Sequence, residues 1–131
     1  MAAVAGWRDK ARPLTITVSG LSGVGKTELA FMIARLTRER HAPQDVLYID
    51  LDPLRRDGGV EVGDALGDLL LDLKVEPEAL GRSLPARQKQ YWERTDRSRL
   101  VLIVDNARYG AELVPLLPAS GDSVVIVASQ S

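Results

Sequence analysis

The chain has 131 residues, of which 45% are hydrophobic and 27% charged, the usual balance of a globular domain. Its 17 basic and 18 acidic residues give a net charge of −1, which argues against direct nucleic-acid binding, because such domains carry a basic excess. The lack of cysteine excludes disulfides and thiolate metal sites, and the single histidine, His41, argues against histidine-based metal sites and serine–histidine triads. No apolar run approaches the ~20 residues that span a bilayer and no signal peptide is visible, so we expect a cytoplasmic protein without membrane contact.

The predicted elements of the first half begin after a tail, residues 1–13, for which we expect no regular structure. LTITVS, residues 14–19, is a β-rich run between Pro and Gly and predicts the first strand. Residues 26–40 predict a helix, because three large apolar residues recur at helical spacing: Leu29, Ile33 and Leu36. VLYIDL, residues 46–51, predicts the second strand.

The second half continues the alternation. Apolar residues between 62 and 73 recur in the pattern of an amphipathic helix, and residues 85–97 predict a basic helix with a weaker pattern. LVLIV, residues 100–104, and SVVIVAS, residues 123–129, are apolar runs typical of strands buried on both faces, and residues 109–117 between them predict a short helix. This order predicts an α/β fold with a parallel sheet covered by helices on both faces.

GLSGVGKT, at the start of the first predicted helix, matches the phosphate-binding pattern G-x-x-x-x-G-K-[ST] through Gly20, Gly25, Lys26 and Thr27. The glycines let backbone N–H groups turn toward phosphate oxygens, Lys26 can reach the β- and γ-phosphates, and the Thr27 hydroxyl can ligate Mg²⁺. The positive end of the helix dipole adds to this attraction. Because a strand precedes the pattern and an amphipathic helix follows it, we expect a phosphate cradle rather than a glycine-rich turn.

A phosphate-binding loop needs a partner for its metal, usually an Asp at the end of a buried strand. Asp105, directly after LVLIV, fits best, because its strand is entirely apolar and its distance from the loop leaves room for the intervening elements. Asp50 and Asp52, at the end of VLYIDL, are rivals, and Asp105 also fits a helix-capping role. We assign Lys26 and Asp105 as catalytic candidates, and Thr27 and Asp105 as metal ligands.

The candidate nucleotide-binding residues comprise the loop, the residue after it and a strand-end hydroxyl: Gly20, Ser22, Gly23, Val24, Gly25, Lys26, Thr27, Glu28 and Ser129. If the loop and Asp105 face one nucleotide, as in P-loop ATPases with an additional strand between them, the four strands follow the order 2-3-4-1 in a three-layer sandwich. Residues 123–129 would then lie between the strands of residues 14–19 and 100–104, and Ser129 would sense the γ-phosphate. We expect residues 14–131 to form one P-loop nucleotide-binding subdomain, a fragment of a longer protein cut after its fourth strand.

Asn106 stands where hydrolysing members of that class usually carry a second acid. An amide can orient water but cannot take its proton, so we expect at most slow ATP hydrolysis. The guanine-reading motif N-K-x-D does not follow the cradle, which disfavours a GTPase and leaves adenine by elimination. The expected ligand is therefore ATP or ADP with Mg²⁺.

GLSGVGKTELA, VLYIDL, LVLIVDNA and ELVPLLPASGDSVVIVAS together resemble the nucleotide-binding subdomain of bacterial NB-ARC proteins, members of the STAND class of signalling ATPases. This resemblance covers about residues 14–131 and implies an ADP/ATP switch in signalling or transcription regulation. It implies that Gly25, Lys26 and Thr27 bind phosphates and Mg²⁺, and that Asp105 holds the metal through water. The partners that it implies are the other subdomains of the parent protein and a nucleotide-dependent oligomer.

The sequence departs from the pattern of that family at three points. The short motif that helps to hold adenine is not visible in residues 1–13, and the helical and winged-helix subdomains that clamp ADP are absent. Gln130 stands where the family carries an arginine after the strand, which puts γ-phosphate sensing in question.

Two other functions fit parts of the sequence. GLSGVGKT also resembles the loop of sulfate-activating kinases, which close arginines over the phosphates; the candidates here are Arg55, Arg56, Arg82 and Arg87. Alternatively, a degenerate fold would serve as an interaction platform, with Tyr91 and Trp92 of the basic helix forming a partner surface. The ordinary expectation for such residues is solvated arginines and packed aromatic rings.

Overall fold

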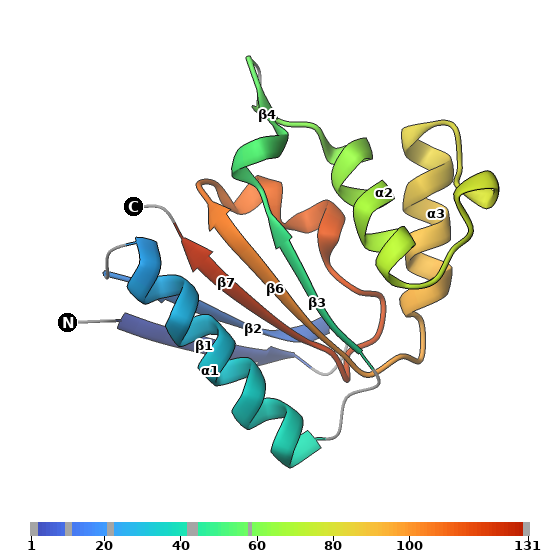
Figure 1. Cartoon of the computed structure of the whole chain (residues 1–131). Coiled ribbons are helices and arrows are strands. Elements are labelled where there is room, and N and C mark those ends of the chain that lie inside the picture. Colours follow the sequence, from blue (N-terminus) through green and yellow to red (C-terminus); the bar gives the residue numbers. More distant parts are fainter. Residues whose placement is uncertain (1–2, 10–11, 21–22, 42–44, 58, 130–131) are drawn as a thin grey trace.

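The computed structural model describes residues 3–9, 12–20, 23–41, 45–57 and 59–129. In these residues a five-stranded sheet carries α1 on one face and α2 and α3 on the other (Figure 1). The strands of this sheet are β1 (Ala3–Asp9), β2 (Arg12–Ser19), β3 (Asp45–Asp50), β6 (Leu100–Ala107) and β7 (Val124–Ser129). The helices are α1 (Gly23–His41), α2 (Val62–Asp72) and α3 (Leu84–Thr95). A short hairpin pairs β4 (Arg55–Arg56) with β5 (Gly59–Val60), and four single turns of 3₁₀ helix connect the larger elements: η1 (Asp52–Leu54), η2 (Pro77–Ala79), η3 (Gly110–Glu112) and η4 (Val114–Leu116).

The sheet has the order β1-β2-β7-β6-β3, which differs from the four-strand order predicted from the sequence. The difference is β1, an antiparallel edge strand formed by residues 3–9, which were expected to be part of a tail. Pairing with β2 covers the backbone hydrogen-bonding groups that would otherwise lie open at that edge. Within the parallel part of the sheet, β7 lies between β2 and β6, as the sequence predicted.

Two other predicted elements differ in detail. Residues 109–117 form the two turns η3 and η4 instead of one short helix, because Pro115 cannot donate a backbone hydrogen bond in the middle of the segment. β6 continues to Ala107, so that Asp105 is a residue of the strand and not its successor. The register of β6 shifts against β7 just after Asp105, where Asn106 adopts a φ of 60°.

The core forms two layers, one on each face of the sheet. α1 packs on its layer mainly through Ala30 and Ala34, which are buried and small enough to let the helix approach the strands closely. Leu36, expected on the packed face of this helix, is half exposed. β6 and β7 are buried along almost their whole length, as their continuous apolar runs predicted. These two central strands therefore hold the residues at their carboxyl ends in fixed positions.

Candidate nucleotide-binding site

The phosphate-binding motif lies where a strand meets a helix. β2 ends at Ser19, Gly20 adopts a φ of 82°, and α1 begins at Gly23. A φ of this size is unfavourable for any residue with a Cβ, so the first glycine of the motif is required by the backbone. Ser22 lies outside the described residues, and so does the side chain of Val24, while Glu28 is exposed. The described part of the motif thus has the strand–loop–helix context that phosphate binding requires.

Lys26 is the charged side chain that this motif brings to the end of the sheet. It is only 7% exposed, and its Nζ donates a hydrogen bond to the main-chain carbonyl oxygen of Ser129, the last residue of β7. The beginning of α1 and the end of β7 lie beside each other (Figure 1). A buried ammonium group whose described partner is a neutral carbonyl gains more from an anion, because a charge-assisted hydrogen bond is roughly twice as strong.

Thr27 and Asp105 meet at the same edge of the sheet. The Thr27 Oγ1 donates to the Oδ2 of Asp105 over 3.0 Å, across 78 residues of sequence. Asp105 is buried, with 5% exposed, and its Oδ1 accepts the backbone N–H of Asn106 over 3.0 Å. The two residues proposed from the sequence as metal ligands therefore lie within one hydrogen bond of each other.

This pair of oxygen donors suits Mg²⁺, which prefers hard oxygen ligands and is usually held by one or two carboxylates together with substrate phosphates. The described residues contain no group of three or more His, Cys, Asp or Glu side chains that could hold a metal by themselves. Thr27 and Asp105 would accordingly hold Mg²⁺ as a complex with a nucleotide, where the cation neutralises phosphate charge.

Tyr48 contacts Asp105 as well, and sequence reasoning missed it. The hydroxyl of Tyr48, on β3, donates to the Oδ2 of Asp105 over 2.7 Å, the oxygen that Thr27 also contacts. Its ring stacks on Phe31 of α1, with centroids 5.2 Å apart and planes inclined by 25°. Burial and the hydrogen bond to Asp105 both raise the pKa of Tyr48, so the phenol remains a donor at neutral pH. The available signal was its position in VLYIDL, two residues before the strand-end acid.

The rival acid Asp50 lies directly beside Asp105, because the two residues are paired in the register of β3 and β6. The Oδ1 of Asp50 accepts hydrogen bonds from the Asn106 Nδ2 over 2.8 Å and from the backbone N–H of Asp52 over 3.0 Å. The contact with Thr27 belongs to Asp105. Asp52, the other rival, is exposed and contacts the Nε of Arg55 over 3.4 Å.

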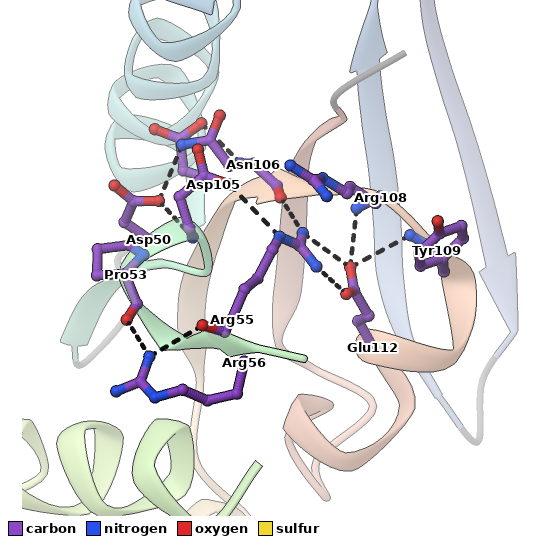
Figure 2. A network of polar contacts seen from close by, with 10 residues as sticks. Asp50, Pro53, Arg55, Arg56, Asp105, Asn106, Arg108, Tyr109 and Glu112 are labelled. Carbon is purple, nitrogen blue, oxygen red and sulfur yellow. Dashed lines mark hydrogen bonds and ion pairs between the residues drawn. The ribbon is translucent and has the colours of Figure 1, made fainter. Parts of the chain in front are cut away.

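A second polar cluster lies next to the first and centres on Arg55 and Glu112 (Figure 2). The guanidinium of Arg55 forms an ion pair with Glu112 and donates to the carbonyl oxygen of Asn106 over 2.6 Å. A carboxylate oxygen of Glu112 also accepts the backbone N–H groups of Arg108 and Tyr109, over 2.8 and 3.2 Å. Burial raises the pKa of Glu112, but the hydrogen bonds from Arg55 and the two N–H groups outweigh it and leave the pKa lowered.

Three of the four arginines considered for a kinase lid, Arg55, Arg56 and Arg87, have structural contacts. Arg87 donates from its Nε to the carbonyl of Gly81 and from its Nη1 to that of Gly63, both over 2.8 Å, which ties α3 to α2. Arg56 contacts the main-chain carbonyls of Pro53 and Arg55, and Arg82 is exposed. These contacts give Arg87 a role in packing.

The aromatic pair on α3 does not form the surface that the interaction-platform alternative needs. Tyr91 is 1% exposed, and its hydroxyl donates to the carbonyl of Leu116 over 2.6 Å, while Trp92 is exposed. One ring therefore belongs to the core and the other to the solvent-facing side of the helix.

Comparison with known proteins identifies relatives of two kinds. The chain is 34% identical over 113 residues to the regulatory protein AfsR of Streptomyces griseus, a match that covers 86% of this chain and 11% of the relative. It is 30% identical over 131 residues to AfsR of Streptomyces coelicolor, covering 99% of this chain and 13% of the relative. It is 34% identical over 80 residues to the nucleoside-triphosphatase THEP1 of Pyrobaculum aerophilum, covering 61% of this chain and 43% of the relative.

The chain thus spans little more than a tenth of the length of the AfsR proteins. No model of a known protein family matches it, and no solved structure does. The mainly parallel sheet, the strand–loop–helix motif and the similarity to a nucleoside-triphosphatase together relate the chain to P-loop NTPases. Among the described residues, none of the helices has the length and apolar character needed to cross a bilayer.

Proposed function

We propose that this chain is an ATP- or ADP-binding module of a STAND-type switch in signalling or transcription regulation. The observation that carries the proposal is the meeting of Lys26, Thr27 and Asp105 at the carboxyl ends of β6 and β7. Ligands of parallel α/β sheets bind at this edge, and the start of a helix adds backbone N–H donors for an anion. A lysine, a hydroxyl and a carboxylate in this arrangement suit a nucleotide phosphate chain with Mg²⁺.

Each residue has a defined part in the proposed site. Lys26 exchanges its contact with a main-chain carbonyl for stronger, charge-assisted contacts with phosphate oxygens. Thr27 and Asp105 hold Mg²⁺, which supplies neutralisation of phosphate charge. The hydroxyl of Ser129, at the end of β7, is the proposed γ-phosphate sensor.

The names of the relatives support a regulatory, nucleotide-dependent role. The AfsR proteins are regulatory proteins and THEP1 is a nucleoside-triphosphatase, and NB-ARC proteins, which the sequence resembles, combine both properties. In this proposal, residues 14–131 form the nucleotide-binding part of a longer protein in the cytoplasm. The module acts together with the other subdomains of that protein and with further copies of it.

Slow turnover belongs to the proposal. The side-chain amide of Asn106 donates to Asp50, and an amide cannot accept the proton of an attacking water. The module therefore binds nucleotide, and hydrolysis in isolation is slow or absent. A switch needs this property, because its two states must persist long enough to be read.

The proposal predicts that Lys26→Ala weakens ADP binding at least tenfold, because the variant loses the side-chain charge that faces the phosphates. Isothermal titration calorimetry of the wild type and the variant in one Mg²⁺-containing buffer measures the difference. Lys89→Ala is the matched control, since Lys89 is an exposed lysine on α3.

The Lys89→Ala variant should bind ADP like the wild type. Equal ADP affinities of the wild type and Lys26→Ala would contradict the proposal that the loop around Lys26 binds the nucleotide phosphates. A wild type that binds neither ADP nor ATP would favour the interaction-platform alternative.

A further inference from the structure

We propose that Tyr48 is a positioning residue that holds the Asp105 carboxylate in the orientation needed for a nucleotide-bound divalent cation. The inference rests on the proposed function, because it concerns the metal half of that site. Tyr48 lies on β3, so the proposed site extends beyond the phosphate-binding motif between β2 and α1.

The hydrogen bonds of Asp105 fix the orientation of its carboxylate. Its Oδ2 accepts the hydroxyls of Thr27 and Tyr48 over 3.0 and 2.7 Å, and its Oδ1 accepts the N–H of Asn106 over 3.0 Å. Rotation of the carboxylate would break at least one of these bonds. A threonine hydroxyl that ligates a cation through a lone pair still has its proton to donate, so the arrangement is compatible with bound Mg²⁺.

Tyr48 is itself held by the helix that carries the metal-binding hydroxyl. Phe31, which stacks on the Tyr48 ring, lies four residues after Thr27 on α1, so the two side chains share a face of the helix. α1 therefore reaches Asp105 in two ways, directly through Thr27 and indirectly through Phe31 and Tyr48. Such outer partners orient metal ligands, and their loss typically weakens metal binding about 10- to 100-fold.

The surroundings of Tyr48 differ from those of a tyrosine that serves packing alone. Tyr48 is 38% exposed, and its hydroxyl contacts a carboxylate on a neighbouring strand. Tyr91 is 1% exposed, and its hydroxyl contacts a main-chain carbonyl inside the core. The two residues form a matched pair for experiment, because Tyr→Phe removes one hydrogen-bonded hydroxyl from each and keeps the ring.

The test measures binding of a non-hydrolysable ATP analogue by calorimetry, with excess Mg²⁺ and separately with EDTA, for the wild type, Tyr48→Phe and Tyr91→Phe. Tyr48→Phe should lower the affinity about tenfold in Mg²⁺ and leave it within twofold in EDTA. Tyr91→Phe should keep the wild-type affinity in both buffers, although it melts at a lower temperature. A Mg²⁺ titration at fixed analogue concentration should show a correspondingly higher midpoint for Tyr48→Phe alone.

The outcomes separate this inference from the function on which it rests. Equal affinities of the wild type and Tyr48→Phe in Mg²⁺, an equal loss in both buffers, or a wild-type affinity that does not depend on Mg²⁺ would each overturn the role of Tyr48. In those three cases the nucleotide-binding proposal stands. A wild type that binds the analogue in neither buffer would overturn both.

Discussion

Two polar clusters lie side by side at the carboxyl end of β6, and they differ in how their charges are satisfied. The first, the hydroxyl–carboxylate cluster of Thr27, Tyr48 and Asp105, holds a buried carboxylate with two neutral hydroxyls and one backbone N–H. The second, the arginine cluster of Arg55 and Glu112, is an ion pair whose carboxylate also accepts two backbone N–H groups (Figure 2).

We propose that this difference separates a ligand-binding site from a structural support. A carboxylate that already pairs with a guanidinium gains little from a further ligand, and its loss leaves a mostly buried arginine without its nearest counter-charge. A carboxylate held by neutral hydroxyls retains its attraction for a cation. Polar contacts of similar length therefore have different consequences, and mutations in the two clusters should have opposite signatures.

The largest effect on stability is expected in the arginine cluster. Glu112→Gln removes the buried counter-charge of Arg55, whose side chain is only 13% exposed and which keeps its pair with the exposed Asp52, and should lower the free energy of unfolding by about 2 kcal/mol. Nucleotide affinity should change less than twofold, because the contacts of Arg55 and Glu112 among the described residues do not reach Lys26 or Thr27. Urea unfolding followed by circular dichroism and calorimetric titration with ADP measure the two quantities.

The same variant tests the pH dependence of the cluster. Because the pKa of Glu112 is lowered by folding, its contribution to stability is present above the unfolded pKa of 4.5 and is lost as the pH falls through the folded value. The difference in stability between the wild type and Glu112→Gln should therefore shrink below about pH 4.5. A difference that stays constant down to pH 3 would contradict this explanation.

In the hydroxyl–carboxylate cluster we expect the reverse, a loss of nucleotide affinity without a loss of stability. Asp105→Asn should weaken Mg²⁺-nucleotide binding about tenfold, equal to 1.4 kcal/mol, because the cation loses a charged oxygen ligand. Its free energy of unfolding should be unchanged or higher, since the substitution removes one of two carboxylates paired at the ends of β3 and β6. A variant that unfolds more readily than Glu112→Gln would show that Asp105 serves the fold.

The smallest effect should come from Arg55→Lys. Lysine keeps the charge that faces Glu112 but cannot also bridge to the carbonyl of Asn106, which Arg55 reaches with a second nitrogen. The expected loss is about 1 kcal/mol of stability with unchanged nucleotide affinity. Urea unfolding of both variants tests the ranking, and a loss as large as that of Glu112→Gln would mean that the bridge to Asn106 matters as much as the ion pair.

The hydroxyl–carboxylate cluster was partly predictable from the sequence, because the chemistry of its two proposed ligands is local. Thr27 belongs to a motif of fixed spacing, and Asp105 follows an apolar run that is typical of a buried strand. Their meeting follows from the pairing of parallel strands, whose carboxyl ends share an edge. Tyr48 could not be recognised in this way, because a tyrosine in an alternating strand is ordinarily a packing residue.

The arginine cluster and β1 were not predictable, because both depend on contacts between distant residues. Arg55 and Glu112 are separated by 57 residues, and either would be read from the sequence as a solvated surface charge. The residues of β1 are mostly small and lack a strong alternating pattern, so the sequence does not predict a strand there. The strand forms because it pairs with the edge of β2, a contact that depends on the folded sheet.

The central claim is that the hydroxyl–carboxylate cluster binds nucleotide while the neighbouring arginine cluster supports the fold. The most direct test is the rise in melting temperature on adding saturating Mg²⁺ and the non-hydrolysable ATP analogue to the wild type, Asp105→Asn and Glu112→Gln. The account predicts that Glu112→Gln melts below the wild type but rises by the same amount, while Asp105→Asn melts at or above the wild type and rises less. A full rise in Asp105→Asn together with a lost rise in Glu112→Gln would contradict the account.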